Sequence, residues 1–448
     1  MAFIIDRQTL ADLEIFEAYG VKNNIFKLFD KTLTQGGREK LLQMFNHPLS
    51  DMEKIRERQD AINFMYREKL LFPVDSISLG FIESYLLMSD KPNRLTRMNA
   101  WHKALKYLLN PVNENYLIQR GIEYVIDVLQ KLYAFVTEYT GQNLPPLLEQ
   151  HFNYITDSIT NTELRRIIGF KTKRRIRPME RERFDYIFRY HKYDRLKNIL
   201  QILYQIDAYQ TVSLTMAEYG LVFPEIVEDK VIEINGLVHP YIKEAVANNI
   251  VLNEKGNLFF ITGANMAGKS TFLKAFGVAI YLAHLGFPVA AVSMRTGVFN
   301  GLFSTINITD NLNKGYSHFY AEVLRVKHVA EEINRTGNLV VIFDELFRGT
   351  NVKDAYDASL AIISAFAKVP GSLFLISTHI MEVADQLSSI DNIRFGYFYT
   401  TIEDKTPIYS YQLREGVTAE RLGMLIIENE RIVEIINAGT NLSVLLQN

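Results

Sequence analysis

Residues 263–270 carry the sequence pattern that most restricts how this chain can fold. They read Gly-Ala-Asn-Met-Ala-Gly-Lys-Ser and match G-x-x-x-x-G-K-[ST], in which a glycine-rich loop joins a β-strand to an α-helix. The preceding residues 258–262 are short and apolar, as is typical of a buried parallel strand, and residues 271–282 continue with helical spacing. The pattern predicts an α/β fold with an anion site, where backbone N–H groups and the helix N-terminus face a phosphate.

Four side chains have predicted roles in binding and hydrolysing a nucleoside triphosphate. Lys269 is expected to contact the β- and γ-phosphates, and the Ser270 hydroxyl to bind Mg²⁺. Further along, the apolar residues 339–343 are followed by Asp344 and Glu345. Asp344 would also bind Mg²⁺, and Glu345 would orient and deprotonate the attacking water. An acidic pair alone is equally typical of a helix start, so its combination with the loop carries this interpretation.

A third predicted strand, residues 373–377, is followed by Thr378 and His379. The carboxyl ends of neighbouring parallel strands lie at one edge of a sheet, where ligands bind. His379 is therefore expected to sense the γ-phosphate. The alternative is that His379 has only a structural role at the end of the strand, with its hydrogen bonds satisfied there.

The composition of the chain excludes several classes of site. It has 448 residues, which suggests about three domains, with two or four possible. It contains no cysteine, which excludes disulfides, thiolate zinc sites and cysteine nucleophiles. The start of the chain does not resemble a secretory signal, and the apolar run 279–294 is too short and too interrupted to span a bilayer. We expect a soluble cytoplasmic protein.

The pattern of apolar residues changes near residue 225. Residues 1–225 have helical spacing with few glycines and prolines and predict an all-α domain. Residues 226–448 alternate apolar strands with helices, which predicts an α/β domain with a mostly parallel sheet.

A basic segment, residues 165–197, departs from this pattern. It contains thirteen Lys and Arg residues against four acidic ones, although the whole chain has a net charge of −2, and tyrosines are interleaved among them. One interpretation is a surface that contacts the DNA phosphate backbone. The other is a solvated helix face paired with acids elsewhere, since no base-reading motif accompanies the charges. The candidate DNA contacts are Lys171, Lys173, Arg174, Arg175 and Arg177.

The loop 262–271, with Asn265 and Met266 inside it, resembles the phosphate-binding loop of the MutS mismatch-repair family. Residues 344–350, the following Asp354, residues 377–379 and residues 310–322 also resemble motifs of its ATPase domain. The helical half shows a looser likeness in Leu10, Leu13, Glu14 and Ile15, in residues 29–32, Gly37 and Pro48, and in Arg58 and Gln59. The likeness covers nearly the whole chain.

This resemblance implies an ABC-type P-loop ATPase domain preceded by a helical core and lever domain. It also implies a homodimer formed through the ATPase domains, with two composite sites that bind ATP and Mg²⁺. In each site Ser317 would come from the partner subunit. The implied nucleotide-binding residues are Gly263, Ala264, Asn265, Met266, Ala267, Gly268, Lys269, Ser270 and Thr271.

The sequence also departs from the family pattern. We expect the mismatch-reading, connector and clamp domains to be absent, and Tyr316 and His318 replace the usual Arg and Thr beside Ser317. No aromatic residue near Val246 is identified that would stack on adenine. Two functions stay open: an ATPase that binds DNA structures in repair or recombination, or a regulatory scaffold ATPase that acts on a protein partner without DNA.

Overall fold

The structure is a computed structural model, and it describes residues 2–17, 23–88, 113–170, 176–306, 318–347, 350–378, 380–403, 406–418 and 429–436. The chain divides into two compact units. One comprises Met1–Phe26, His47–Ile55 and Tyr219–Asn448, and we call it the α/β unit. The other comprises Lys27–Asn46 and Arg56–Glu218, and we call it the helical unit. The predicted domain limits, 1–225 and 226–448, stay a prediction; they would assign residues 1–26, 47–55 and 219–225 differently from these compact units.

The described residues of the helical unit are mostly helical. The helices described there are α3 (Gln35–Asn46), α5 (Ser76–Leu86), α7 (Asn113–Glu138), α8 (Pro146–Thr160), α9 (Arg165–Ile168), α10 (Pro178–Tyr186) and the π-helical turn η1 (Ile187–His191). Three further helices, α2 (Ile25–Phe29), α4 (Met52–Arg67) and α11 (Tyr193–Tyr219), contain residues of both units.

Helix α11 supplies much of the core of the helical unit and also forms hydrogen bonds to the turn that precedes α3. Leu196, Ile199 and Leu203 recur at helical spacing and are buried. The buried carboxylate of Asp207 accepts hydrogen bonds from the backbone N–H groups of Leu33, at 3.0 Å, and Thr34, at 2.9 Å. A buried carboxylate needs such donors, because burying it without them is costly. The turn before α3 is therefore fixed by α11.

The α/β unit contains a seven-stranded sheet with the order β1-β7-β8-β9-β5-β10-β11. All neighbouring pairs in it are parallel except β10 and β11. A second sheet has the order β2-β6-β3-β4. The strands are β1 (Ile4–Ile5), β2 (Glu225–Val227), β3 (Val231–Leu237), β4 (Asn248–Asn253), β5 (Leu258–Thr262), β6 (Ser293–Gly297), β7 (Gly301–Thr305), β8 (Leu339–Asp344), β9 (Leu373–Ser377), β10 (Ile393–Glu403) and β11 (Thr406–Glu415). The strands predicted at 258–262, 339–343 and 373–377 are thus confirmed as β5, β8 and β9.

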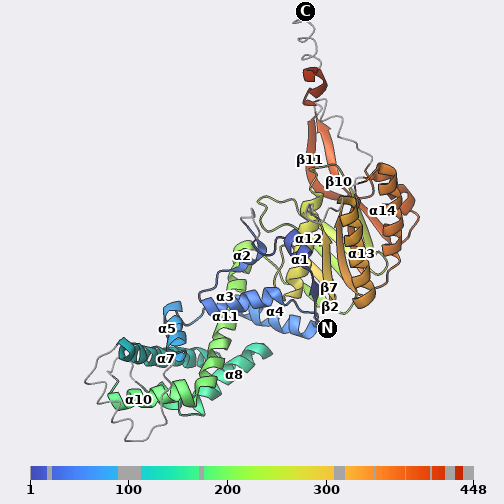
Figure 1. Cartoon of the computed structure of the whole chain (residues 1–448). Coiled ribbons are helices and arrows are strands. Elements are labelled where there is room, and N and C mark those ends of the chain that lie inside the picture. The colour runs from blue at the N-terminus through green and yellow to red at the C-terminus, as the bar shows by residue number, and fades with distance from the viewer. Residues whose placement is uncertain are drawn as a thin grey trace, which may run out of the picture. The chain divides into compact units, whose positions relative to one another are not determined.

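Helices cover both faces of the larger sheet, as Figure 1 shows. The helices of this unit are α1 (Arg7–Asp12), α12 (Lys269–His284), α13 (His318–Thr336), α14 (Val352–Ala367) and α15 (Met381–Leu387). Gly277 lets α12 approach β8, because a Cβ atom there would lie 3.0 Å from Cδ1 of Ile342. On the other face, Phe343 of β8 stacks on Phe366 of α14 with ring centroids 5.8 Å apart. The prediction of a helical part and an α/β part is confirmed.

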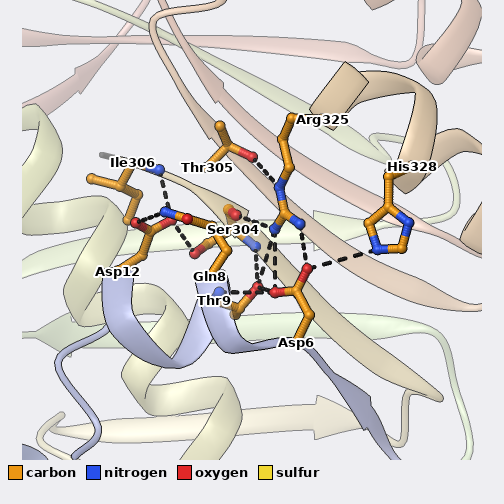
Figure 2. A network of polar contacts seen from close by, with 9 residues as sticks. All are labelled: Asp6, Gln8, Thr9, Asp12, Ser304, Thr305, Ile306, Arg325 and His328. Atoms are coloured by element: carbon orange, nitrogen blue, oxygen red, sulfur yellow. Dashed lines mark hydrogen bonds and ion pairs between the residues drawn. The ribbon is translucent and has the colours of Figure 1, made fainter. Parts of the chain in front are cut away.

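A polar network ties α1 to β7 and α13 within the α/β unit (Figure 2). Ser304 of β7 donates its backbone N–H to Thr9, at 2.9 Å, and its hydroxyl to Asp12, at 2.8 Å. Arg325 of α13 bridges the carboxylate of Asp6 and the carbonyl oxygen of Ser304, the latter at 2.6 Å. The start of the chain is therefore part of the α/β unit rather than of the helical one.

Among the described residues, no helix is both long enough and apolar enough to cross a membrane.

One buried histidine makes the stability of the α/β unit depend on pH. His284, at the end of α12, is 1% exposed. Its Nδ1 lies 2.9 Å from the carbonyl oxygen of Ile280, and its Nε2 accepts the backbone N–H of Phe299 at 3.0 Å. Because Nε2 is an acceptor, the neutral ring fits this site. Burial lowers the pKa of His284 from 6.5 to about 4.

We predict that replacing His284 by Gln removes part of the acid sensitivity of folding. The unfolded chain takes up a proton at His284 near pH 6.5, whereas the folded chain does so near pH 4, so stability falls as the pH drops through this window. Between pH 7 and pH 5 this group should cost about 2 kcal/mol. Urea-induced unfolding of both proteins at the two pH values measures it. If the His284→Gln variant lost as much stability between pH 7 and pH 5 as the wild-type protein, His284 would not be the source of the acid sensitivity.

Candidate functional site

The candidate site lies at the carboxyl edge of the parallel strands β5, β8 and β9. β9 lies between β5 and β8 in the sheet, and Asp344 pairs in register with Ser377. The chain leaves β5 at Thr262, enters the predicted phosphate loop, and continues into α12 from Lys269. The parallel arrangement brings residues from three distant parts of the sequence to one edge.

The loop is shaped by residues in the left-handed region of backbone space. Gly263 has φ of 143° and Gly268 has φ of 104°, which glycine adopts without steric cost. Met266 at the tip has φ of 68° and a side chain that is 77% exposed. The ammonium of Lys269 donates to the carbonyl oxygens of Gly263, at 2.7 Å, and of Ala264, at 2.9 Å. The loop therefore wraps around the lysine that is expected to contact phosphate.

A cluster of three oxygen-bearing side chains lies beside the loop. The hydroxyl of Ser270 and the hydroxyl of Ser377 donate to different oxygens of the Asp344 carboxylate. Asp344 is 6% exposed and Ser377 is fully buried. Hydroxyl and carboxylate oxygens are hard ligands, and Mg²⁺ is commonly held by one or two such groups together with substrate phosphates. Ser270 and Asp344 thus fit the predicted metal site, and Ser377 is a partner of Asp344 to which no role was assigned from the sequence.

Glu345 follows Asp344 directly but has a different backbone conformation. Its φ is 59°, and its N–H donates to the carbonyl oxygen of Ser377 at 2.9 Å. Glu345 lines the same cavity as Lys269 and Ser270. The residue expected to act on water therefore belongs to the same cavity wall as the residue expected to contact phosphate.

The cavity has a volume of about 590 Å³. Beyond the loop, it is lined by residues that the sequence did not single out as site residues: Leu237, Val238, His239, Ile242, Lys243, Glu244, Ala245, Val246, Asn248, Phe398 and Tyr411. Burial lowers the pKa of His239, which favours its neutral form. Tyr411 is 48% exposed and offers an aromatic surface suited to a planar ring, whereas Phe398 is buried, at 1% exposed.

Asn248 joins two distant parts of this cavity wall. Its side-chain amide donates to the carbonyl oxygens of Val246, at 3.1 Å, and Tyr411, at 3.0 Å, and its oxygen accepts the N–H of Leu413 at 2.7 Å. This pairing had no local signal in the sequence, because it joins β4 to β11.

Several predicted site residues lie outside the described residues. They are His379, Ser317, Lys171, Lys173, Arg174 and Arg175. Their roles stay predictions. Arg177, the remaining candidate DNA contact, is exposed at the start of α10.

Not all the basic side chains of the segment 165–197 lie on the surface. Arg189 is 7% exposed and forms a bidentate pair with Asp185, with both N–O distances 2.6 Å. Tyr85 also donates to Asp185, at 2.7 Å. Arg189 therefore belongs to the core of the helical unit, whereas Arg177 and Arg183 are exposed.

Two family models match this chain. MutS domain V matches residues 259–446 and MutS domain III matches residues 8–213. Among curated proteins, the DNA mismatch repair protein MutS of Persephonella marina is 25% identical over 94% of this chain and 58% of its own length. The protein of the same name from Lactococcus lactis subsp. cremoris is 28% identical over 51% of this chain and 28% of its own length. That of Anaplasma phagocytophilum is 31% identical over 49% and 27%. The chain thus spans less than two thirds of these relatives.

We predict that Lys269→Met weakens binding of a nucleoside triphosphate by about 10- to 150-fold, because charge-assisted hydrogen bonds contribute about 1.5–3 kcal/mol. Lys274→Met is the matched control: this lysine lies on the same helix but pairs with Glu14 at 2.6 Å, and it does not line the cavity. Calorimetric titration of both variants measures the effect. Equal losses in the two would argue against the assigned role of Lys269.

Proposed function

The chain belongs to the MutS family, and from this membership we propose that it binds ATP with Mg²⁺, hydrolyses it, and couples the reaction to DNA binding. Domain V, the ATPase domain of the family, matches the α/β unit's long C-terminal segment. The observation that carries the proposal is the convergence of Lys269, Ser270, Asp344 and Glu345 at one sheet edge, with Lys269, Ser270 and Glu345 lining one cavity. The DNA function is proposed by analogy with relatives named as DNA mismatch repair proteins.

Each side chain has a defined task in this proposal. Lys269 exchanges its two loop carbonyls for phosphate oxygens and so stabilises their negative charge. Ser270 and Asp344 hold Mg²⁺, which when bound neutralises charge on the phosphates. Ser377 keeps the Asp344 carboxylate oriented. Glu345 orients the attacking water and accepts its proton.

The far wall of the cavity is suited to the nucleobase. Tyr411 supplies an exposed aromatic surface, and Ile242 and Val246 supply exposed apolar ones. We propose that the base lies there, against the ring of Tyr411.

The remaining features follow from the family resemblance. We propose an ABC-type dimer through the ATPase domains, in which Ser317 of each chain contacts the nucleotide of the other and His379 senses the γ-phosphate. The exposed Arg177 and the neighbouring Lys171, Lys173, Arg174 and Arg175 are proposed to contact DNA phosphates.

We predict that Glu345→Gln leaves ATP affinity nearly unchanged and lowers the hydrolysis rate by about 100- to 10,000-fold, the usual contribution of a general base. Phosphate release and equilibrium ATP binding, each with and without Mg²⁺, measure the two effects. Glu244→Gln is the control, because Glu244 lines the same cavity but has no assigned part in hydrolysis. Undiminished hydrolysis by Glu345→Gln would refute the proposed mechanism.

We predict that Arg177→Ser weakens DNA binding to a similar degree for all sequences and lowers the slope of log K against log salt by about one unit. Arg120→Ser is the control, since Arg120 is also exposed in this unit but pairs with Glu123 at 3.1 Å. Binding and ATPase stimulation are measured with duplex, branched and mismatched DNA across a salt series. If no DNA changed the ATPase rate and Arg177→Ser did not weaken DNA binding, the scaffold function would be favoured instead.

A further inference from the structure

The turn that follows β8 contains two bulky residues in a backbone conformation that favours glycine. Glu345 has φ of 59° and Phe347 has φ of 64°. Bulky side chains rarely adopt this region, and they keep it only where surrounding structure enforces it. Resting on the proposed ATPase function, we propose that Phe347 is a positioning residue, which holds this turn so that Glu345 faces the nucleotide.

The alternation of side chains along β8 explains why the turn is needed. Phe343 packs on Phe366 of α14, on one face of the sheet, and Asp344 bonds to Ser270 of α12, on the other. If the strand continued in extended form, the side chain of residue 345 would return to the face of Phe343. That face is an apolar core, in which a carboxylate would be costly. The left-handed conformation instead leaves Glu345 in the cavity wall.

Packing of Phe347 supplies the force that holds this turn. Phe347 is 3% exposed, and its ring centroid lies 5.7 Å from that of Phe319 in the first turn of α13. Leu346 is also buried, in the same core. At the other end of the turn, the N–H of Glu345 is bonded to Ser377. Glu345 is thus held between a hydrogen bond to β9 and an aromatic contact with α13.

The test compares Phe347→Ala with Phe366→Ala, which also removes a buried aromatic ring from this core but one that stacks on β8 and β9 rather than on the turn. We expect Phe347→Ala to lower kcat for MgATP by about 10- to 100-fold, the scale of a misplaced reacting group, with KM unchanged. Phe366→Ala should lose stability but keep kcat. Phe347→Leu, which keeps apolar bulk but loses the ring contact with Phe319, should lower kcat less than Phe347→Ala. If the alanine variant does not fold, Phe347→Leu is measured instead, and a wild-type kcat in it would overturn the proposal.

A double-mutant cycle separates positioning from a general structural defect. If Phe347 acts through Glu345, Phe347→Ala should not lower further the residual rate of Glu345→Gln. The same fall in both backgrounds would overturn the proposal, as would an unchanged kcat in Phe347→Ala.

Amide hydrogen exchange at Glu345 gives a readout that does not need hydrolysis. Phe347→Ala should lose protection of this amide, which is bonded to Ser377, while Phe366→Ala should keep it. If the wild-type protein hydrolyses no ATP, the proposed function fails, and this exchange measurement still decides the inference. Unchanged protection in Phe347→Ala would overturn it.

Discussion

The carboxylate of Asp344 holds together the chain segments on which the candidate site depends. It ends β8, accepts the hydroxyl of Ser270 at the start of α12, and accepts that of Ser377 at the end of β9. A buried carboxylate is stable only with such donors, so each strand end is fixed by the others. The same carboxylate is the one suited to bind a cation, and structural order and proposed chemistry therefore rest on a single group.

The part of this site that could be predicted from sequence is the part with local signals. β5, β8 and β9 are short apolar runs, and each is followed directly by the residues of interest. Parallel strands place their carboxyl ends at one edge, so Lys269, Ser270, Asp344 and Glu345 could be expected to meet before any coordinates were known. The helical half was likewise predicted from spacing alone.

The rest depends on pairings between distant residues, which spacing does not reveal. Asn248 and Tyr411 are 163 residues apart, yet a hydrogen bond joins them in the cavity wall. Arg189 counted as a surface charge in the sequence, but the carboxylate of Asp185 makes it a core residue. Phe347 lies in the segment 344–350 that resembles a family motif, but no role for it followed, because its unusual backbone conformation has no signature in a single sequence.

The membership of the first residues in the α/β unit has a consequence for how the chain folds during synthesis. β1 pairs with β7, with Ile4 opposite Gly301, so this edge of the sheet cannot form until β7 has left the ribosome. Domains generally fold as they emerge, and pairings over long separations form slowly. The larger part of the helical unit, Arg56–Glu218, is complete before β7 appears. β1 therefore stays without its strand partner until β7 has been synthesised, and the contacts of α1 with β7 form only then.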